Sequence, residues 1–285
     1  MNKIFSLMIL CAAVLMVSSC RDKDNPAIPD LKRTVLPQFV KDTSVDVLIQ
    51  DPATFRGRFN VGLYFANDNK PQKMDIVVVM NGDKSKIKTL KANVSSFPAT
   101  IDVTADQLAQ LFGKTAADIQ TGDAFDIGAD VTLTDGTFIP IFRTDGTEPY
   151  GGDAQNFPGS SLSIQYKKVC PLDINDLLGT FTVDDPDFWE ASYPVTIALE
   201  GTNVLKITGW VQDPTAVIRF NVNLKTQEIT VPKQVYLPTL PGTPYHKPAA
   251  EGTGTVDACA TTMSVRLTNT VDEGSFGAAT VELHK

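Results

Sequence analysis

Apolar and polar side chains alternate along much of the chain, and a period of two predicts β-strands with one buried face. The segment RFNVGLYF begins at Arg58, and every second residue from Phe59 to Phe65 is apolar. Asn81-Gly82-Asp83 has the composition of a tight turn and predicts a hairpin between its flanking segments. Similar strand patterns occur at 74–81, 85–94, 99–103, 124–143 and 160–169. We therefore expect a β-sandwich over residues 34–168.

One short helix is expected inside this sandwich. In Thr104-Ala105-Asp106-Gln107 the threonine and the glutamine have the spacing of a capping box, in which each side chain bonds to the other's backbone N–H. Leu108, Leu111 and Phe112 supply an apolar stripe, and Gly113 is a typical helix end.

Residues 169–285 form a second predicted domain that begins at Cys170-Pro171. Seven or eight short strands with tight turns predict an antiparallel meander, either closed into a small up-and-down barrel or left as a curled sheet. The interior of such a barrel is a packed core or a ligand pocket. Alternation such as Val195, Ile197 and Leu199 favours the packed core. The predicted fold class is all-β in both domains.

The N-terminus has the pattern of a targeting segment. Lys3 precedes an apolar run from Ile4 to Val17, which is too short for a spanning helix. Val17-Ser18-Ser19-Cys20 resembles the lipobox of bacterial lipoproteins. The resemblance implies that residues 1–19 are a signal peptide, that Cys20 is acylated, and that outer-membrane lipid holds the protein. Two or three acyl chains make a stable anchor.

Residues 20–33 follow as the lipid anchor and a tether, with two prolines and mixed charge. The run from Arg21 to Asp24 is similar to the export signal that sends some lipoproteins of gut-dwelling Gram-negative anaerobes to the outer face of the outer membrane. The expected location is therefore the outer membrane, facing the cell exterior. A solvated linker would have the same charges without any export role.

Charge and cysteine content narrow the classes of function and partner. The formal net charge is -8, which disfavours nucleic acid and any docking that needs a basic face. Of the four cysteines, Cys11 lies in the signal peptide and Cys20 is the lipidation site. Cys170 and Cys259 remain, either as a disulfide or as two separate buried thiols.

The segment from Pro98 to Thr137 combines a strand, a capped helix ending in Leu-Phe-Gly, a loop and a further strand. This succession resembles the N-terminal immunoglobulin-like domain of SusE-type lipoproteins. The resemblance implies that residues 34–168 are a spacer near the membrane and that the partner is a SusC/SusD-type transporter. Residues 169–285 resemble the C-terminal β-meander domains of such lipoproteins, some of which are similar to lipocalin-like calycins.

Candidate ligand-binding residues are aromatic and lie near predicted loops. Phe188 and Trp189 lie within an acidic run, and Tyr236 and Tyr245 lie in or beside a Pro-rich segment at 235–255. Aromatic rings bind the apolar C–H faces of sugars and also anchor peptides, and loops often carry binding residues. A loop as long as 235–255 is usually either functional or disordered.

The acidic run from Asp184 to Glu190 offers four carboxylates, which Ca²⁺ accepts as ligands, but their spacing fits no EF-hand and suits an acidic turn better. We predict no metal site and no cofactor. Catalytic motifs are also missing from the sequence, whose only histidines are His246 and His284, so we predict a protein that is not an enzyme.

The sequence thus predicts an accessory surface lipoprotein of a nutrient-uptake system. Its C-terminal domain would bind a glycan, a peptide or the transporter. The alternative is a lipid or small apolar ligand inside a calycin-like barrel.

Overall fold

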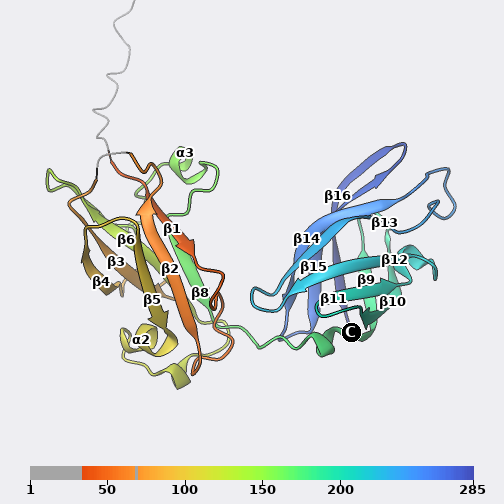
Figure 1. Ribbon diagram of the computed structural model, residues 1–285, viewed down its shortest axis with the longest axis horizontal. Coiled ribbons are helices and arrows are strands. Elements are labelled where there is room, and N and C mark those ends of the chain that lie inside the picture. Colours follow the sequence, from red (N-terminus) through yellow and green to blue (C-terminus); the bar gives the residue numbers. More distant parts are fainter. Residues whose placement is uncertain (1–33, 68–69) are drawn as a thin grey trace, which may run out of the picture. The chain divides into compact units, whose positions relative to one another are not determined.

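The computed structural model describes residues 34–67 and 70–285, and β-strands make up most of their regular structure (Figure 1). The all-β fold expected from the alternation of side chains is confirmed. The predicted signal peptide, the lipidation site Cys20 and the tether fall on residues 1–33, outside the described residues. Among the residues described, none of the helices has the length and apolar character needed to cross a membrane.

The first domain consists of two antiparallel sheets. One sheet has the order β1-β2-β5, and the other has the order β4-β3-β6-β7, with β8 also paired to β6. A single cluster of buried side chains joins the two sheets and includes Phe59, Ile76 and Phe125. The domain is therefore a sandwich, built from β1 (Pro37–Lys41), β2 (Arg56–Leu63), β3 (Lys73–Met80), β4 (Lys88–Val94), β5 (Ala99–Thr104), β6 (Ala124–Thr132), β7 (Phe138–Ile139) and β8 (Ser163–Lys167).

The predicted capping box forms at the start of α2 (Ala105–Gln110). The Gln107 N–H donates to Thr104 Oγ1 at 3.1 Å, and the Thr104 N–H donates to Gln107 Oε1 at 2.9 Å. Leu108 is fully buried on the inner face of the helix. Gly113 has a φ of +70°, which glycine adopts at little cost, and the chain leaves the helix there.

Two details of the predicted sandwich are wrong. A second short α-helix, α3 (Gly152–Gln155), accompanies α2; its four residues carry no apolar stripe that the sequence pattern would reveal. The strand expected to reach Phe65 ends at Leu63, and Phe65 is 47% exposed. Continued alternation after a strand's last paired residue therefore does not ensure burial.

The second domain is a closed barrel of eight antiparallel strands in chain order. Of the two predicted forms, the closed barrel is the one observed (Figure 1). Closure comes from pairing between the first and last strands, where Leu283 lies opposite Val183. The strands are β9 (Gly179–Asp185), β10 (Ala191–Leu199), β11 (Val204–Thr208), β12 (Val217–Asn223), β13 (Glu228–Val235), β14 (Ala249–Asp257), β15 (Thr262–Val271) and β16 (Gly274–His284).

The barrel interior is filled by the chain's own side chains. Trp210, on the 3-10 turn η3 (Trp210–Gln212), is 1% exposed and makes edge-to-face contacts with Tyr193 and Phe220, each with ring centroids 6.1 Å apart. Inward-facing residues from all eight strands join the same cluster. The prediction fails for Leu199, which is 39% exposed at the end of β10.

Cys170 and Cys259 are joined by a disulfide, so the structure contains the bridged alternative of the two that the sequence left open. Their Cα atoms lie 5.3 Å apart, although 89 positions separate them in sequence. The bridge ties the segment before β9 to the turn between β14 and β15. The buried Gln227 strengthens this region, because its side-chain amide donates to the Cys170 carbonyl at 2.7 Å.

Candidate functional site

Four of the barrel's connections lie at one end, which we call the loop end. Because successive strands run in opposite directions, every second connection emerges on the same side. The β9–β10, β11–β12, β13–β14 and β15–β16 connections therefore share the loop end, at residues 186–190, 209–216, 236–248 and 272–273. The disulfide and the start of β9 lie at the opposite end.

Aromatic rings gather at the loop end from two connections and from the first residues of β16. Phe276, near the start of β16, is 45% exposed and makes edge-to-face contacts with Phe188 and Tyr245, with ring centroids 5.2 Å apart in both pairs. Trp189 lies next to Phe188, with their centroids 6.4 Å apart, and is partly exposed. We call these four residues, Phe188, Trp189, Tyr245 and Phe276, the aromatic cluster.

The long β13–β14 connection is an ordered part of the loop end. It folds back on itself through backbone hydrogen bonds from Tyr236 to Pro248 (3.0 Å), from Lys247 to Pro238 (2.9 Å) and from Leu240 to Tyr245 (2.9 Å). Leu237 and Leu240 are buried and join the barrel core. The loop predicted at 235–255 is shorter than expected, because β14 begins at Ala249. Its fold holds Tyr245 against Phe276.

A histidine–carboxylate contact and an ion pair connect this loop to the β15–β16 turn. His246 Nδ1 lies 2.6 Å from Glu273 Oε1, and the His246 backbone N–H donates to the other oxygen of that carboxylate at 3.0 Å. These hydrogen bonds hold the pKa of Glu273 below its usual value. Lys247 Nζ lies 2.9 Å from Asp272 Oδ2. All four side chains are exposed, so their main effect is to fix the position of the loop.

A buried carboxylate supports the connection that carries Phe188 and Trp189. Asp185 is 1% exposed at the end of β9, and it accepts a hydrogen bond from the Phe188 N–H at 3.0 Å. Burial raises the pKa of Asp185, while the backbone N–H groups of Phe188 and Trp189 oppose that rise. Burial also raises the pKa of Tyr193 and of Tyr236, and the nearby charge of Asp185 adds to both shifts.

The neighbouring Asp184 faces the other side of β9, because successive strand residues alternate. It accepts a hydrogen bond from the Ser192 hydroxyl at 2.5 Å and lies 3.0 Å from His284 Nε2. The first two carboxylates of the acidic run therefore do not converge on one point. The residues that the structure describes contain no group of three or more His, Cys, Asp or Glu side chains able to hold a metal ion.

Three of the four sequence-predicted ligand residues meet in the aromatic cluster, and the fourth does not. Phe188, Trp189 and Tyr245 come together there, whereas Tyr236 is 4% exposed and packs in the barrel core. Placing Tyr236 among surface residues was wrong, because its ring turns inward where β13 ends. Sequence reasoning missed Phe276; the available signal was its position between two glycines, Gly274 and Gly277.

The chemistry of the loop end suits binding through flat apolar surface and hydrogen bonds. Ring faces contact the C–H faces of sugars or the side chains of peptides. The exposed carboxylates of Asp187 and Glu190 flank Phe188 and Trp189 in the same connection, and they can accept hydrogen bonds from hydroxyl or amide groups of a ligand. Asp272 and Glu273, which are also exposed, already pair with Lys247 and His246.

Replacing Asp185 by Asn tests the buried carboxyl. A raised folded-state pKa means that the folded protein binds the proton more tightly than the unfolded chain, so stability falls as pH rises from about 4 through the folded pKa. Asp185→Asn keeps an acceptor for the Phe188 N–H and removes this titration. We therefore expect the free energy of unfolding of the variant, measured in urea, to rise relative to that of the wild type as the pH is raised from 4 to 7. Parallel pH profiles would contradict the prediction.

No protein-family model matches this chain, and comparisons with curated proteins and with solved structures return no match.

Proposed function

We propose that this chain is a surface-anchored accessory lipoprotein of an outer-membrane nutrient-uptake system and that the loop end of its barrel binds a glycan. The observation that carries the binding role is the aromatic cluster. It brings four rings together at the loop end, with Phe276 exposed between Phe188 and Tyr245.

A glycan fits this surface better than a wholly apolar ligand does. Exposed Asp187 and Glu190 lie in the same connection as Trp189, so hydrogen-bond acceptors stand beside a ring. A sugar ring presents C–H groups on its faces and hydroxyl donors around its edge, and it matches both features. Because the His246–Glu273 contact, the Lys247–Asp272 ion pair and the backbone hydrogen bonds already hold the loop, binding costs little ordering of the protein.

The alternative, a lipid inside the barrel, receives no support from the interior. The centre of the barrel is occupied by Trp210, Phe220 and their neighbours, all nearly unexposed. An interior ligand would have to displace packed side chains, at a cost of several kcal/mol. Binding at the loop end needs no such rearrangement.

The membrane and transporter parts of the proposal rest on the sequence. A lipid on Cys20, a tether to residue 33 and then the sandwich would place two elements before the barrel. Palmitate labelling of cells that carry the wild type or Cys20→Ala tests the anchor, and only the wild type should be labelled. Pulldown from native outer membrane should recover a transporter, and its absence would contradict the accessory role.

The binding role is tested with the full chain in affinity gel electrophoresis against a panel of polysaccharides. At least one should retard the wild type, and Trp189→Ala or Phe276→Ala should weaken binding about 10-fold or more, the loss expected for one ring contact. Phe138→Ala is the control, because Phe138 is a 57% exposed aromatic residue of the sandwich. The proposal would be contradicted if no polysaccharide retarded the wild type, or if Phe138→Ala lost as much binding as the loop-end variants.

A further inference from the structure

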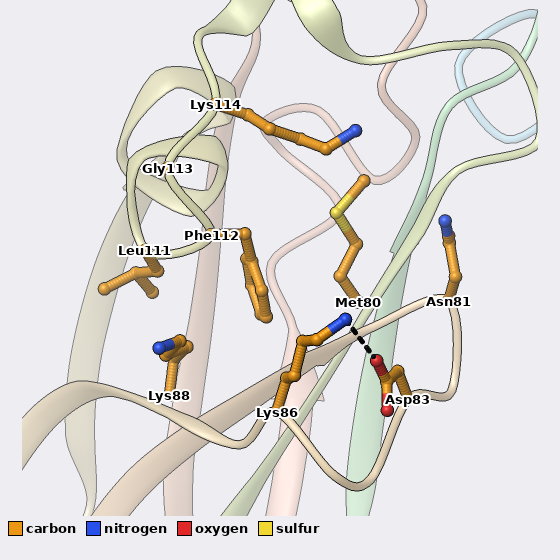
Figure 2. A pocket seen from close by; sticks show the side chains of 9 residues that line it. All are labelled: Met80, Asn81, Asp83, Lys86, Lys88, Leu111, Phe112, Gly113 and Lys114. Atoms are coloured by element: carbon orange, nitrogen blue, oxygen red, sulfur yellow. Dashed lines mark ion pairs between the residues drawn. The ribbon is translucent and has the colours of Figure 1, made fainter.

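The sandwich contains a cleft of its own, between the β3–β4 hairpin and the end of α2. Its volume is about 510 Å³, within the range of small-molecule sites. Figure 2 shows the nine residues that line it, which are Met80, Asn81, Asp83, Lys86, Lys88, Leu111, Phe112, Gly113 and Lys114. All of them lie within the first domain, so nothing in the cleft depends on the barrel.

Local structure explains why these side chains converge. The capped helix α2 ends where Gly113 adopts positive φ, and the Lys114 N–H returns to the Ala109 carbonyl at 3.1 Å. Lys114 therefore follows a sharp turn, and Figure 2 shows its side chain extending across the top of the cleft. On the opposite side, the turn after Met80 brings Asp83 and Lys86 toward the same space.

The interior wall of the cleft is apolar. Phe112 is partly exposed, and its ring packs on the buried Phe125 with the centroids 6.1 Å apart. In Figure 2 its ring lies between Lys88 on one side and Lys86 and Met80 on the other. Met80 is only 8% exposed and Leu111 is partly exposed. Phe112 therefore offers a supported ring surface to a ligand.

Cations outnumber carboxylates in the lining by three to one, although the chain as a whole carries a net charge of -8. Lys86 is paired with Asp83 at 3.1 Å, and hydrogen bonds from Ser85 and Lys86 hold the pKa of Asp83 below its usual value. Lys88 and Lys114 form no direct ion pair with any residue that the structure describes. Hydrogen bonds from Thr115 lower the pKa of Asp118, and the charge of Lys114 adds to that shift. The cleft thus presents two ammonium groups that no carboxylate in the described part of the chain contacts directly.

We infer that this cleft binds an organic anion whose carboxylate is attached to a ring with an apolar face. The ammonium groups of Lys88 and Lys114 attract the carboxylate, and Phe112 contacts the ring. An acidic sugar and an aromatic acid share this chemistry. The inference goes beyond the proposed glycan site and does not rest on it, because the two sites lie in different domains.

Isothermal titration calorimetry on the full chain tests the site with trigalacturonate for an acidic sugar and phenylacetate for an aromatic acid. At least one should bind, and its affinity should fall as salt rises, because the attraction is between charges. The Lys88→Gln/Lys114→Gln variant should lose about 10-fold or more. If the wild type binds trigalacturonate and the double variant loses that binding, with no such loss for phenylacetate, the ligand is an acidic sugar. If the loss is confined to phenylacetate, the ligand is an aromatic acid.

Lys91→Gln supplies the control, because Lys91 is exposed on the same strand β4 and does not line the cleft. It should leave binding unchanged, and so should Phe276→Ala, which alters only the loop end. Binding of neither probe, an equal loss in Lys91→Gln, or equally tight binding of inorganic phosphate would overturn the inference. Failure of the glycan proposal would leave all these results unaffected.

Discussion

Trp210→Ala should destabilise the barrel by about 3–5 kcal/mol, the usual cost of removing a large buried aromatic side chain. Trp210 is 1% exposed, and its edge-to-face partners Tyr193 and Phe220 are themselves fully buried. Their positions are fixed by strand pairing, so they are poorly able to move into the space that the indole leaves. Urea unfolding followed by circular dichroism measures the change.

Leu199→Ala is the matched control. Leu199 lies at the end of β10 and is 39% exposed, so its truncation should change the free energy of unfolding by about 0.5 kcal/mol or less. If the two domains give separate unfolding transitions, the transition assigned to the barrel is the one that must shift. A loss below about 1 kcal/mol for Trp210→Ala would contradict the tightly packed interior.

Loss of the disulfide should have the second largest effect. In the chain-entropy description, a bridge that closes a long loop restricts the unfolded chain, and removing one typically costs about 2–4 kcal/mol. The Cys170–Cys259 bridge spans 89 positions of sequence and joins the segment before β9 to the β14–β15 turn. We expect Cys170→Ser/Cys259→Ser to lose that much stability in urea.

Reduction provides an internal check on this second prediction. A reductant should destabilise the wild type by the same amount and should leave the double variant unchanged. Mass spectrometry after alkylation without reductant should find neither Cys170 nor Cys259 modified, and alkylation of both would contradict the bridge.

The barrel shows which features a sequence pattern can reveal. Alternation locates strands because the burial of one face of a strand is recorded in the order of its own consecutive residues. It places Val195 and Ile197 correctly in the core. Closure is different, because it depends on Leu283 of β16 lying opposite Val183 of β9, and no local pattern records that pairing. The sequence therefore left barrel and curled sheet open.

Glycines gave the most misleading signal. Gly252 and Gly254 resemble loop residues in the sequence, yet both lie in β14. A Cβ at Gly252 would collide with the Arg266 carbonyl oxygen, and a Cβ at Gly254 would collide with that of Ser264. These glycines allow β15 to approach β14 closely. The need for glycine there comes from the neighbouring strand, so the residues around Gly252 and Gly254 do not reveal it. The same confusion made the predicted 235–255 loop too long.

The candidate binding end was predictable in part. Phe188, Trp189 and Tyr245 were identified because they lie outside regular alternation, where side chains are free to face solvent. Phe276 belongs to a strand and was missed, although it contacts two of the other three rings. Its role depends on loops that are distant in sequence and meet only in the folded barrel.

The chain contains two tryptophans, and this allows the central claim to be tested directly. In a Trp210→Phe variant, Trp189 is the sole fluorescent indole and reports on the aromatic cluster. We predict that a polysaccharide that retards the wild type shifts the emission of Trp189. The polysaccharide concentration at the midpoint of this shift should equal the dissociation constant measured by affinity electrophoresis. Unchanged emission at a ligand concentration that saturates binding would contradict a glycan site at the loop end.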